Sequence, residues 1–409
     1  MAVETVIKTI GATGTFSTPQ LWEDGAPANL TTAERSACTT FLVATFVQGE
    51  ALTFVGSGAT GVMLDTDSTG VGTGTYMTYG ITAGNPTAAD VITGTSTATC
   101  VLTSGTPDFT GIIWQGQCQN QDFSVAGTVV TFGGPSTSTT AYMHLTTAAG
   151  ASFRDHATAQ TNPLRADPAV GACLTCTPAS GNAVLSTGTG VRLSNLQIRA
   201  TGSNGRSMSF QGLSGLLENC ILEGRRTTVA TTDASFLFGN GTSGTLRNCV
   251  IIQRVTGADH IIASQTASIT LANCTIVAPD DFAAAPTSIF VTGLSGTMTL
   301  QNCALFAGDS TKAIVTSSGS TYNFTTCASD ISGTAGVTQV TYATEFKDVT
   351  DATSDFKLRP GASQINAGTI DTTNAATDIV GTARPKGPSY DIGAWEFIPG
   401  PTLWAGGMI

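Results

Sequence analysis

A short motif recurs five times between residues 217 and 329, and each copy holds a cysteine at the same position. Four copies read aliphatic-x-Asn-Cys-x-aliphatic, whereas the last has Thr in place of Asn. The copies lie at 217–222, 246–251, 271–276, 300–305 and 324–329, so their cysteines are 29, 25, 29 and 24 residues apart. A motif that repeats at this period indicates a solenoid, and its strand-forming residues favour a β-solenoid over helical repeats.

Each copy is interpreted as two short strands on either side of a bend. The Asn fits the bend because its side chain tolerates the left-handed backbone conformation. The Cys then faces the core on the next strand, as the alternation of side chains along a strand requires. A third strand is expected upstream of each Cys, at 208–210, 236–238, 261–263, 289–291 and 313–315. Three strands per coil predict an all-β chain built on a right-handed parallel β-helix.

Stacked coils place equivalent side chains in ladders along the rod. The residues of this predicted structural ladder are Asn219, Cys220, Asn248, Cys249, Asn273, Cys274, Asn302, Cys303 and Cys327. Strands in register are about 4.8 Å apart, whereas a disulfide needs Cβ atoms about 3.8 Å apart and a specific torsion angle. We therefore expect buried thiols that pack as small apolar groups. Cys173 and Cys176 are a lone pair that supports zinc only weakly, and neither a metal nor a cofactor is expected.

The composition disfavours several classes of partner. Charged residues make up 11% of the chain and the formal net charge is −11, whereas a nucleic-acid partner needs clustered Lys and Arg. No run of 18 apolar residues is present, so no membrane span is expected. The N-terminus lacks a basic region followed by an apolar stretch, so we expect synthesis in the cytoplasm without a conventional signal peptide.

The motif and the segments around it divide the chain into five regions. These are an N-terminal cap segment at 1–37, a β-rich region at 38–165, the parallel β-helix at 166–335, a C-terminal closing segment at 336–397 and an apolar tail at 398–409. Residues 17–23 are interpreted as a short helix that begins with Thr before Pro and covers the open first coil. The β-rich region is expected to be antiparallel, either as a small sandwich or as an elaborated mouth of the rod.

The tail contains Leu403, Trp404, Met408 and Ile409, which are expected to dock on a neighbouring protein or to fold back on the rod. A frayed terminus is the alternative.

Three segments after the last motif, at 355–368, 378–385 and 390–397, share a pattern with known proteins. They resemble the terminal segment of right-handed parallel β-helix repeat proteins of phages and bacteria, which have the pectate lyase-like fold. The usual form carries Pro and Asp where this chain has Gln364 and Asn366. The resemblance implies that the segment closes the rod. It does not imply an activity, because such β-helices include lyases, glycosidases, adhesins and virion parts.

A β-helix that cleaves polysaccharide generally needs two carboxylates that converge on one groove. The outward positions of the upstream strands are instead expected to hold Leu237, Ile262, Phe290 and Ile314. The best acidic pair is Asp280–Asp281, but adjacent residues point apart and the preceding Pro indicates a loop. The sequence offers no convincing catalytic cluster, so we expect a non-enzymatic protein.

The resemblance to phage-encoded β-helices, the apolar ends and the missing signal peptide together predict a structural protein of a phage virion. The favoured form is a capsid decoration or cement protein on the virion surface. Its expected partners are the major capsid protein or other virion proteins, and it is expected to form a homotrimer. The alternative is a tailspike or tail-fibre protein that binds host surface polysaccharide, with or without cleavage, through stacking on Phe290 or Trp114. A bacterial surface adhesin is a third hypothesis.

Overall fold

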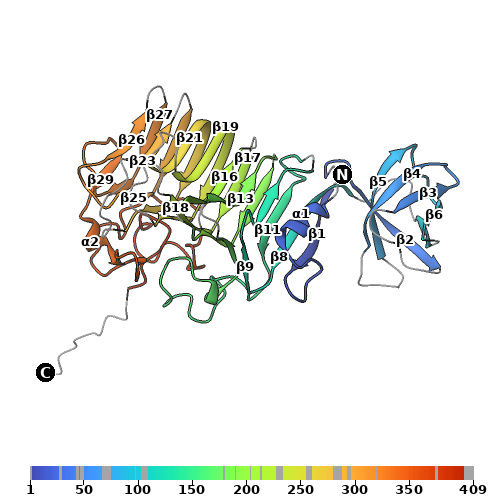
Figure 1. Ribbon diagram of the computed structural model, residues 1–409, viewed down its shortest axis with the longest axis horizontal. Helices are drawn as coiled ribbons and strands as arrows, with labels where there is room; N and C mark the ends of the chain where they lie inside the picture. Colours follow the sequence, from blue (N-terminus) through green and yellow to red (C-terminus); the bar gives the residue numbers. More distant parts are fainter. Residues whose placement is uncertain are drawn as a thin grey trace.

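The computed structural model describes most of the chain. The described residues are 2–26, 30–42, 46, 50–66, 75–96, 98–102, 109–135, 137–177, 180–188, 190–202, 204–211, 214–226, 234–254, 260–279, 288–292, 296–317, 320–373 and 376–399. They form a long rod of strands with a small β-domain at one end and the short helix α2 (Tyr342–Glu345) at the other (Figure 1). Among the described residues, no helix is long and apolar enough to cross a membrane.

The rod is a parallel β-solenoid with three parallel sheets along its axis. The first sheet contains β10 (Val130–Phe132), β13 (Ser180–Ser186), β16 (Asn204–Phe210), the first parts of β19 (Ala234–Arg247) and β21 (His260–Ala272), β23 (Ser288–Thr292) and β26 (Ala313–Ser317). The second contains β1 (Ala2–Ile10), β8 (Phe109–Cys118), β11 (Met143–Thr147), β14 (Val191–Ser194), β17 (Ser214–Glu218), the second parts of β19 and β21, β24 (Thr297–Gln301) and β27 (Thr321–Thr325). The third contains β9 (Asp122–Val125), β12 (Cys173–Cys176), β15 (Gln197–Ala200), β18 (Ile221–Arg226), β20 (Val250–Gln253), β22 (Thr275–Val277), β25 (Ala304–Phe306), β28 (Cys327–Ser329) and β29 (Val337–Gln339).

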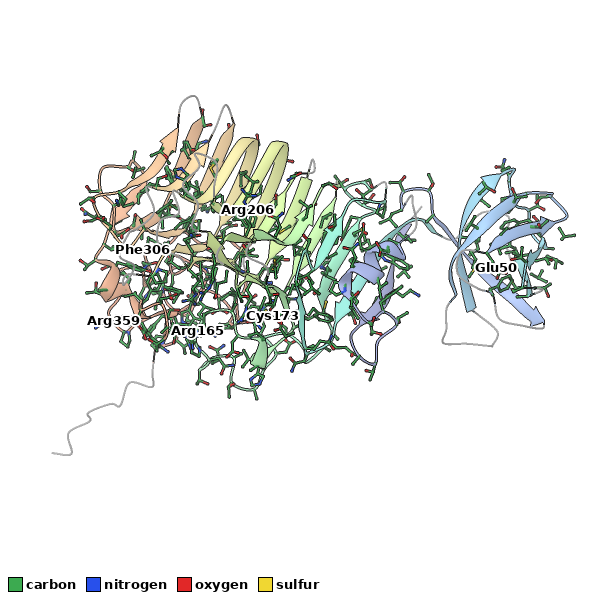
Figure 2. All side chains as sticks on the ribbon, viewed as in Figure 1. Glu50, Arg165, Cys173, Arg206, Phe306 and Arg359 are labelled. Atoms are coloured by element: carbon green, nitrogen blue, oxygen red, sulfur yellow. The ribbon has the colours of Figure 1, made fainter. Side chains whose placement is uncertain are left out.

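These ladders confirm the predicted all-β fold with three strands per coil. The upstream strands predicted at 208–210, 236–238, 261–263, 289–291 and 313–315 all lie in the first sheet. Inward side chains from the three sheets fill one continuous core along the rod, and Figure 2 labels Cys173 among the side chains of the solenoid. Equivalent residues of successive coils stack in this core, as Phe236, Ile262 and Phe290 do.

The small β-domain is a closed antiparallel barrel. Its strands are β2 (Glu34–Leu42), β3 (Ala51–Val55), β4 (Thr60–Thr66), β5 (Thr75–Ala83), β6 (Val91–Gly94) and β7 (Thr99–Leu102). They pair in the ring β2–β5–β4–β3–β6–β7 and back to β2, with a core of its own around Phe54, Tyr79 and Ile92. Closing a sheet into a ring leaves no unpaired strand edge. The region is antiparallel, as predicted, and forms a closed barrel instead of a sandwich.

The barrel is inserted within the solenoid, not placed before it. Strand β1 pairs in parallel with β8, and β8 pairs in parallel with β11, so solenoid strands lie on both sides of the barrel in sequence. The first residues of β2 also pair with β8, at Glu34–Thr110 and Arg35–Phe109. The sequence predicted that the β-helix starts at residue 166. The parallel ladder in fact begins with β1 and β8, far upstream of that residue.

A short helix covers the N-terminal end of the core, as predicted. Helix α1 (Pro19–Asp24) starts at Thr18, whose hydroxyl accepts a hydrogen bond from the Leu21 N–H at 3.2 Å. Its Trp22 is fully buried and packs edge-on against Phe132 at 6.0 Å between ring centroids. The helix hides apolar side chains of the first coils that would otherwise face water.

The closing segment lies along the rod as well as at its end. It includes α2 and the antiparallel pair β30 (Phe346–Asp348) and β31 (Asp355–Leu358). Outward side chains of the third sheet, such as Val250 and Phe306, form a second core with residues of the closing segment and of the loop around Phe153. The middle of the third sheet, strands β20, β22 and β25, is therefore buried on both faces, which explains why these strands are almost wholly apolar.

Candidate functional site

The asparagines of the motif make the bend between the second and third sheets. Asn195, Asn219, Asn248, Asn273 and Asn302 have φ values of 61°, 53°, 50°, 54° and 52°, which is the left-handed region. The last coil uses Thr326 with a φ of 54° at the same point. The backbone of the bend therefore has the conformation that the motif predicts.

The Asn side chains also bond to one another along the rod. The Nδ2 of Asn219 donates to Oδ1 of Asn195 at 3.3 Å, and Nδ2 of Asn248 donates to Oδ1 of Asn219 at 3.2 Å. The Nδ2 of Asn302 donates to Oδ1 of Asn273 at 3.1 Å. No such bond joins Asn248 to Asn273, where the buried Oδ1 of Asn248 and Nδ2 of Asn273 have no partner. The ladder is thus interrupted once.

The cysteines beside them form a buried, unbridged column. Cys220, Cys249, Cys274, Cys303 and Cys327 are all fully buried and in no disulfide. Thiols of this column donate to main-chain oxygens of the preceding coil, for example Cys274 to Leu246 O at 3.6 Å. Burial raises the pKa of the Cys249 thiol well above its ordinary value. These thiols act as small packing groups, since only an exposed thiolate is reactive.

Three buried carboxylates organise the closing segment. Asp378, Asp391 and Glu396 are at most 1% exposed, and each accepts hydrogen bonds from main-chain N–H groups. Asp378 accepts from Val380 at 3.0 Å, Thr382 at 2.7 Å and Glu396 at 3.1 Å. Such bonds replace the water that each carboxylate loses on burial.

The other two carboxylates brace the final turn. Asp391 accepts from the N–H of Asn366 at 2.7 Å and from that of Phe397, while Glu396 accepts from Lys386 at 2.8 Å and from Asp391 at 3.2 Å. Burial raises the pKa of Asp391 to about 6.

The terminal pattern also depends on the glycine between these acids. Gly393 has a φ of +106°, and a Cβ there would lie 2.7 Å from Oγ1 of Thr275. Its N–H donates to Asn302 O at 2.8 Å, and the next residue, Ala394, donates to Oγ1 of Thr275 at 2.9 Å. Only glycine combines this backbone angle with such a close approach to the solenoid. The segment 391–396 therefore contacts two coils of the solenoid, at Asn302 and at Thr275.

The predicted outward column of the first sheet is wrong in three of four positions. Ile262 and Phe290 pair in register with Phe236 and lie in the central core, and Ile314 is only 2% exposed. The residue that pairs with Leu237 is Ala263. In a run of consecutive apolar residues the alternation does not reveal which side chain points inward, and a slip of one residue reverses the assignment.

The aromatic residues proposed to stack on sugar rings are also unsuited to that role. Phe290 and Trp114 are fully buried in the central core. Asp280 and Asp281, together with Leu403, Trp404, Met408 and Ile409, lie outside the described residues.

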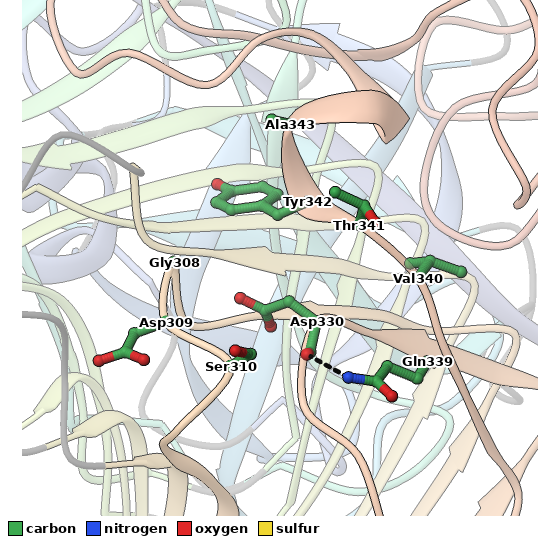
Figure 3. A pocket seen from close by; sticks show the side chains of 9 residues that line it. All are labelled: Gly308, Asp309, Ser310, Asp330, Gln339, Val340, Thr341, Tyr342 and Ala343. Atoms are coloured by element: carbon green, nitrogen blue, oxygen red, sulfur yellow. Dashed lines mark hydrogen bonds between the residues drawn. The ribbon is translucent and has the colours of Figure 1, made fainter.

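A pocket of about 440 Å³ lies at the end of the rod next to α2 (Figure 3). It is formed where the loop after β25 meets the ends of β28 and β29. Its lining residues are Gly308, Asp309, Ser310, Asp330, Gln339, Val340, Thr341, Tyr342 and Ala343. The pocket is predominantly polar, and it brings together two carboxylates from different coils.

The two carboxylates of the pocket have different environments. Asp330 is 6% exposed, its Oδ1 accepts from the Ala307 N–H at 3.3 Å, and burial raises its pKa to about 6. Asp309 accepts from the hydroxyl and the N–H of Thr311 at 2.7 and 2.9 Å, and these bonds lower its pKa. Lys312 lies 3.8 Å from the second oxygen of Asp309. Near pH 6 one group is therefore half protonated and the other fully ionised.

No pattern in the sequence predicted that Asp309 and Asp330 share a pocket. The two residues belong to different coils, and no local pattern connects them. The coil register could have brought them together, because both lie shortly after paired strands β25 and β28 of the third sheet.

The fold and these contacts define the chain as a three-sheet parallel β-solenoid with an inserted antiparallel barrel and a C-terminal segment docked along its side. No family model matches the sequence, and no curated protein matches it. Among solved structures, a crystal structure of pectate lyase Pel9A is similar over 70% of this chain and 88% of that chain, at 12% identity and a TM-score of 0.35. A similarity at this level carries no argument about function.

Proposed function

We propose that this chain is a non-enzymatic structural protein of a phage particle, carried on the capsid as a decoration or cement protein. One observation carries the proposal: a stiff solenoid presents a separate, closed barrel at one end (Figure 1). A rod with a distinct terminal module suits a protein that spans a fixed distance between two contacts. The terminal segment's likeness to phage-encoded β-helices supports the same proposal.

The internal construction of the rod is consistent with a mechanical role. The Asn side chains bond from coil to coil, and the buried carboxylates Asp378, Asp391 and Glu396 are used to anchor the closing segment. The main-chain hydrogen bonds that these buried carboxylates accept favour one rigid arrangement of the closing segment. The rod would therefore hold its end module at a constant position.

In this proposal the chain is made in the host cytoplasm and ends on the virion surface. The barrel or the apolar residues of 398–409 contact the major capsid protein or another virion protein, and three copies associate around one axis. Binding that occurs only in the assembled shell stabilises that shell by mass action.

The test is the copy number of the chain in purified particles, measured by quantitative mass spectrometry against the main shell protein. A number comparable with that of the shell protein is expected. A few copies per particle would overturn the capsid role and support the alternative, a tailspike or tail fibre that binds host polysaccharide. Absence of the chain from particles would overturn both.

A further inference from the structure

The pocket beside α2 combines hydrogen-bonding groups of several kinds. Ser310 and Thr341 supply hydroxyls that both donate and accept, Gln339 supplies an amide, and Asp309 and Asp330 supply carboxylates. Val340 and Ala343 add a small apolar surface. Figure 3 shows Asp309, Ser310 and Asp330 on one side and the α2 residues on another.

Several of these groups have no partner among the described residues. They are Oε1 of Gln339 and the hydroxyls of Ser310 and Thr341. The Nε2 of Gln339 donates to Asp330 O at 3.4 Å, which leaves its carbonyl oxygen directed elsewhere. The pocket thus offers both hydrogen-bond acceptors and hydrogen-bond donors to a ligand.

The walls are firm enough to keep these groups in position. Tyr342 donates from its hydroxyl to Ala278 O at 2.7 Å, and its ring stacks on Phe306 at 4.8 Å between centroids. Asp330 is fixed through its Oδ1 by the Ala307 N–H. A preformed pocket of this kind avoids the entropy cost of ordering side chains when a ligand binds.

The charge of the pocket disfavours anions. The charged side chains that line the pocket are the carboxylates of Asp309 and Asp330. The nearby Lys312 is already paired with Asp309. A ligand with a carboxylate or sulfate group would meet like charge at close range. A ligand rich in hydroxyls, in contrast, can donate to the carboxylates and exchange hydrogen bonds with Ser310, Thr341 and Gln339.

We propose that this pocket binds a neutral sugar residue. Its volume of about 440 Å³ lies in the range of small-molecule sites and accommodates one or two sugar rings. Asp309 and Asp330 accept hydrogen bonds from neighbouring hydroxyls of the ring, and Val340 contacts its less polar face. The inference does not depend on where the protein is carried, because it concerns the isolated chain.

The experiment is saturation-transfer NMR on the purified full-length protein, with five neutral probes measured separately: D-glucose, D-galactose, D-mannose, L-rhamnose and N-acetyl-D-glucosamine. D-galacturonate is the acidic probe. Transfer to at least one neutral sugar is expected, with none to galacturonate. Transfer to no neutral sugar, or to galacturonate alone, would overturn the proposal.

Matched variants separate binding in this pocket from binding elsewhere. Asp309 and Asp348 make the same local contacts, each accepting from the N–H and hydroxyl of the Thr two residues later, but only Asp309 lines the pocket. Asp309→Ala and Asp330→Asn should each weaken binding of the responding sugar by about ten-fold or more, whereas Asp348→Ala should leave it unchanged. Equal binding by all four proteins would show that the sugar binds outside this pocket and would refute the proposal.

Discussion

The guanidinium of Arg384 donates a hydrogen bond to Oδ1 of Asn273 at 3.1 Å and so joins the closing segment to a coil 111 residues earlier. Its second terminal nitrogen donates to Gly393 O at 2.8 Å, and Nε lies 3.6 Å from the Glu396 carboxylate. This contact falls at the single interruption of the Asn ladder. Oδ1 of Asn273 thus accepts from both Arg384 and Nδ2 of Asn302, while Nδ2 of Asn273 keeps no partner.

Removal of Arg384 should therefore loosen the closing segment. In Arg384→Ala, the buried carboxylates of Asp378 and Glu396 lose their cation, and loss of one partner from a buried ion pair costs about 3–5 kcal/mol. The free energy of unfolding, measured by chemical denaturation, should fall by this amount. The control is Arg359→Ala: Arg359 is exposed and its guanidinium donates to Ala343 O, so loss of this side chain should cost less than about 1 kcal/mol. Equal losses in the two variants would contradict a special role for Arg384.

Thr326 occupies the one ladder position where the bend lacks Asn. A β-branched residue in the left-handed region is strained by about 1–2 kcal/mol, and Asn tolerates this region better. Thr326→Asn should raise the free energy of unfolding by about 1 kcal/mol. The reciprocal change, Asn302→Thr, should lower it by about 2–4 kcal/mol, because Asn302 also bonds Asn273 and the Thr369 main chain. Thermal denaturation of both variants tests the pair, and the same sign for both would refute this account.

The parts of the fold that depend on local pattern were predictable from sequence. The Asn–Cys dipeptide predicts the bend, and the Thr18–Pro19 start predicts helix α1, because each depends only on neighbouring residues. The orientation of the first sheet was not predictable from Ile261–Ile262 and Ile289–Phe290, where no alternation is visible.

Features that depend on distant contacts could not be read from the chain. The closing segment packs along the third sheet through a shared apolar core and through contacts such as that of Arg154 with Asp378 O, 224 residues apart, and no local pattern encodes them. Likewise, Asp309 and Asp330 share a pocket only because coils stack. Barrel closure similarly depends on β2 pairing with both β5 and β7.

The buried cysteines lead to a prediction about thiol chemistry. Nine of the ten cysteines have described side chains, all nine are buried, and a thiol reacts only when its thiolate reaches solvent. In the native protein, Ellman's reagent should therefore modify at most one thiol per chain. All ten should react after denaturation under the same conditions. Fast reaction of several thiols in the folded protein would mean that the Cys column is accessible.

The stability that Asp330 and Asp391 contribute to the fold should fall as pH rises from about 4 to about 6. Burial raises the pKa of both Asp330 and Asp391 from 3.8 to about 6. In this window these two side chains bind more protons in the folded chain than in the unfolded chain, so their contribution is complete below pH 4 and is lost through pH 6. Asp309 and Asp348 have lowered pKa values, so their stabilisation is lost only at more acidic pH.

Melting temperatures between pH 4.5 and pH 7.5 measure this dependence. Asp330→Asn should flatten the profile, because its side chain stays neutral while its oxygen can still accept from Ala307. Asp348→Asn is the control and should leave the slope unchanged. The pH account fails if the Asp330→Asn profile is parallel to that of the unaltered protein.

Truncation of the C-terminus tests whether residues 398–409 dock on a partner. A chain that ends at Phe397 keeps the Phe397 N–H bond to Asp391 and the whole carboxylate network, so its melting temperature should match that of the full chain. A chain that ends at Trp395 loses Glu396 and its bonds to Lys386 and Asp391, so it should unfold more easily. If the tail is the attachment segment of the proposed particle protein, the first truncation folds normally but no longer binds particles in a sedimentation assay. Particle binding by this chain at the level of the full-length protein would rule out the tail and leave the barrel as the contact to be tested.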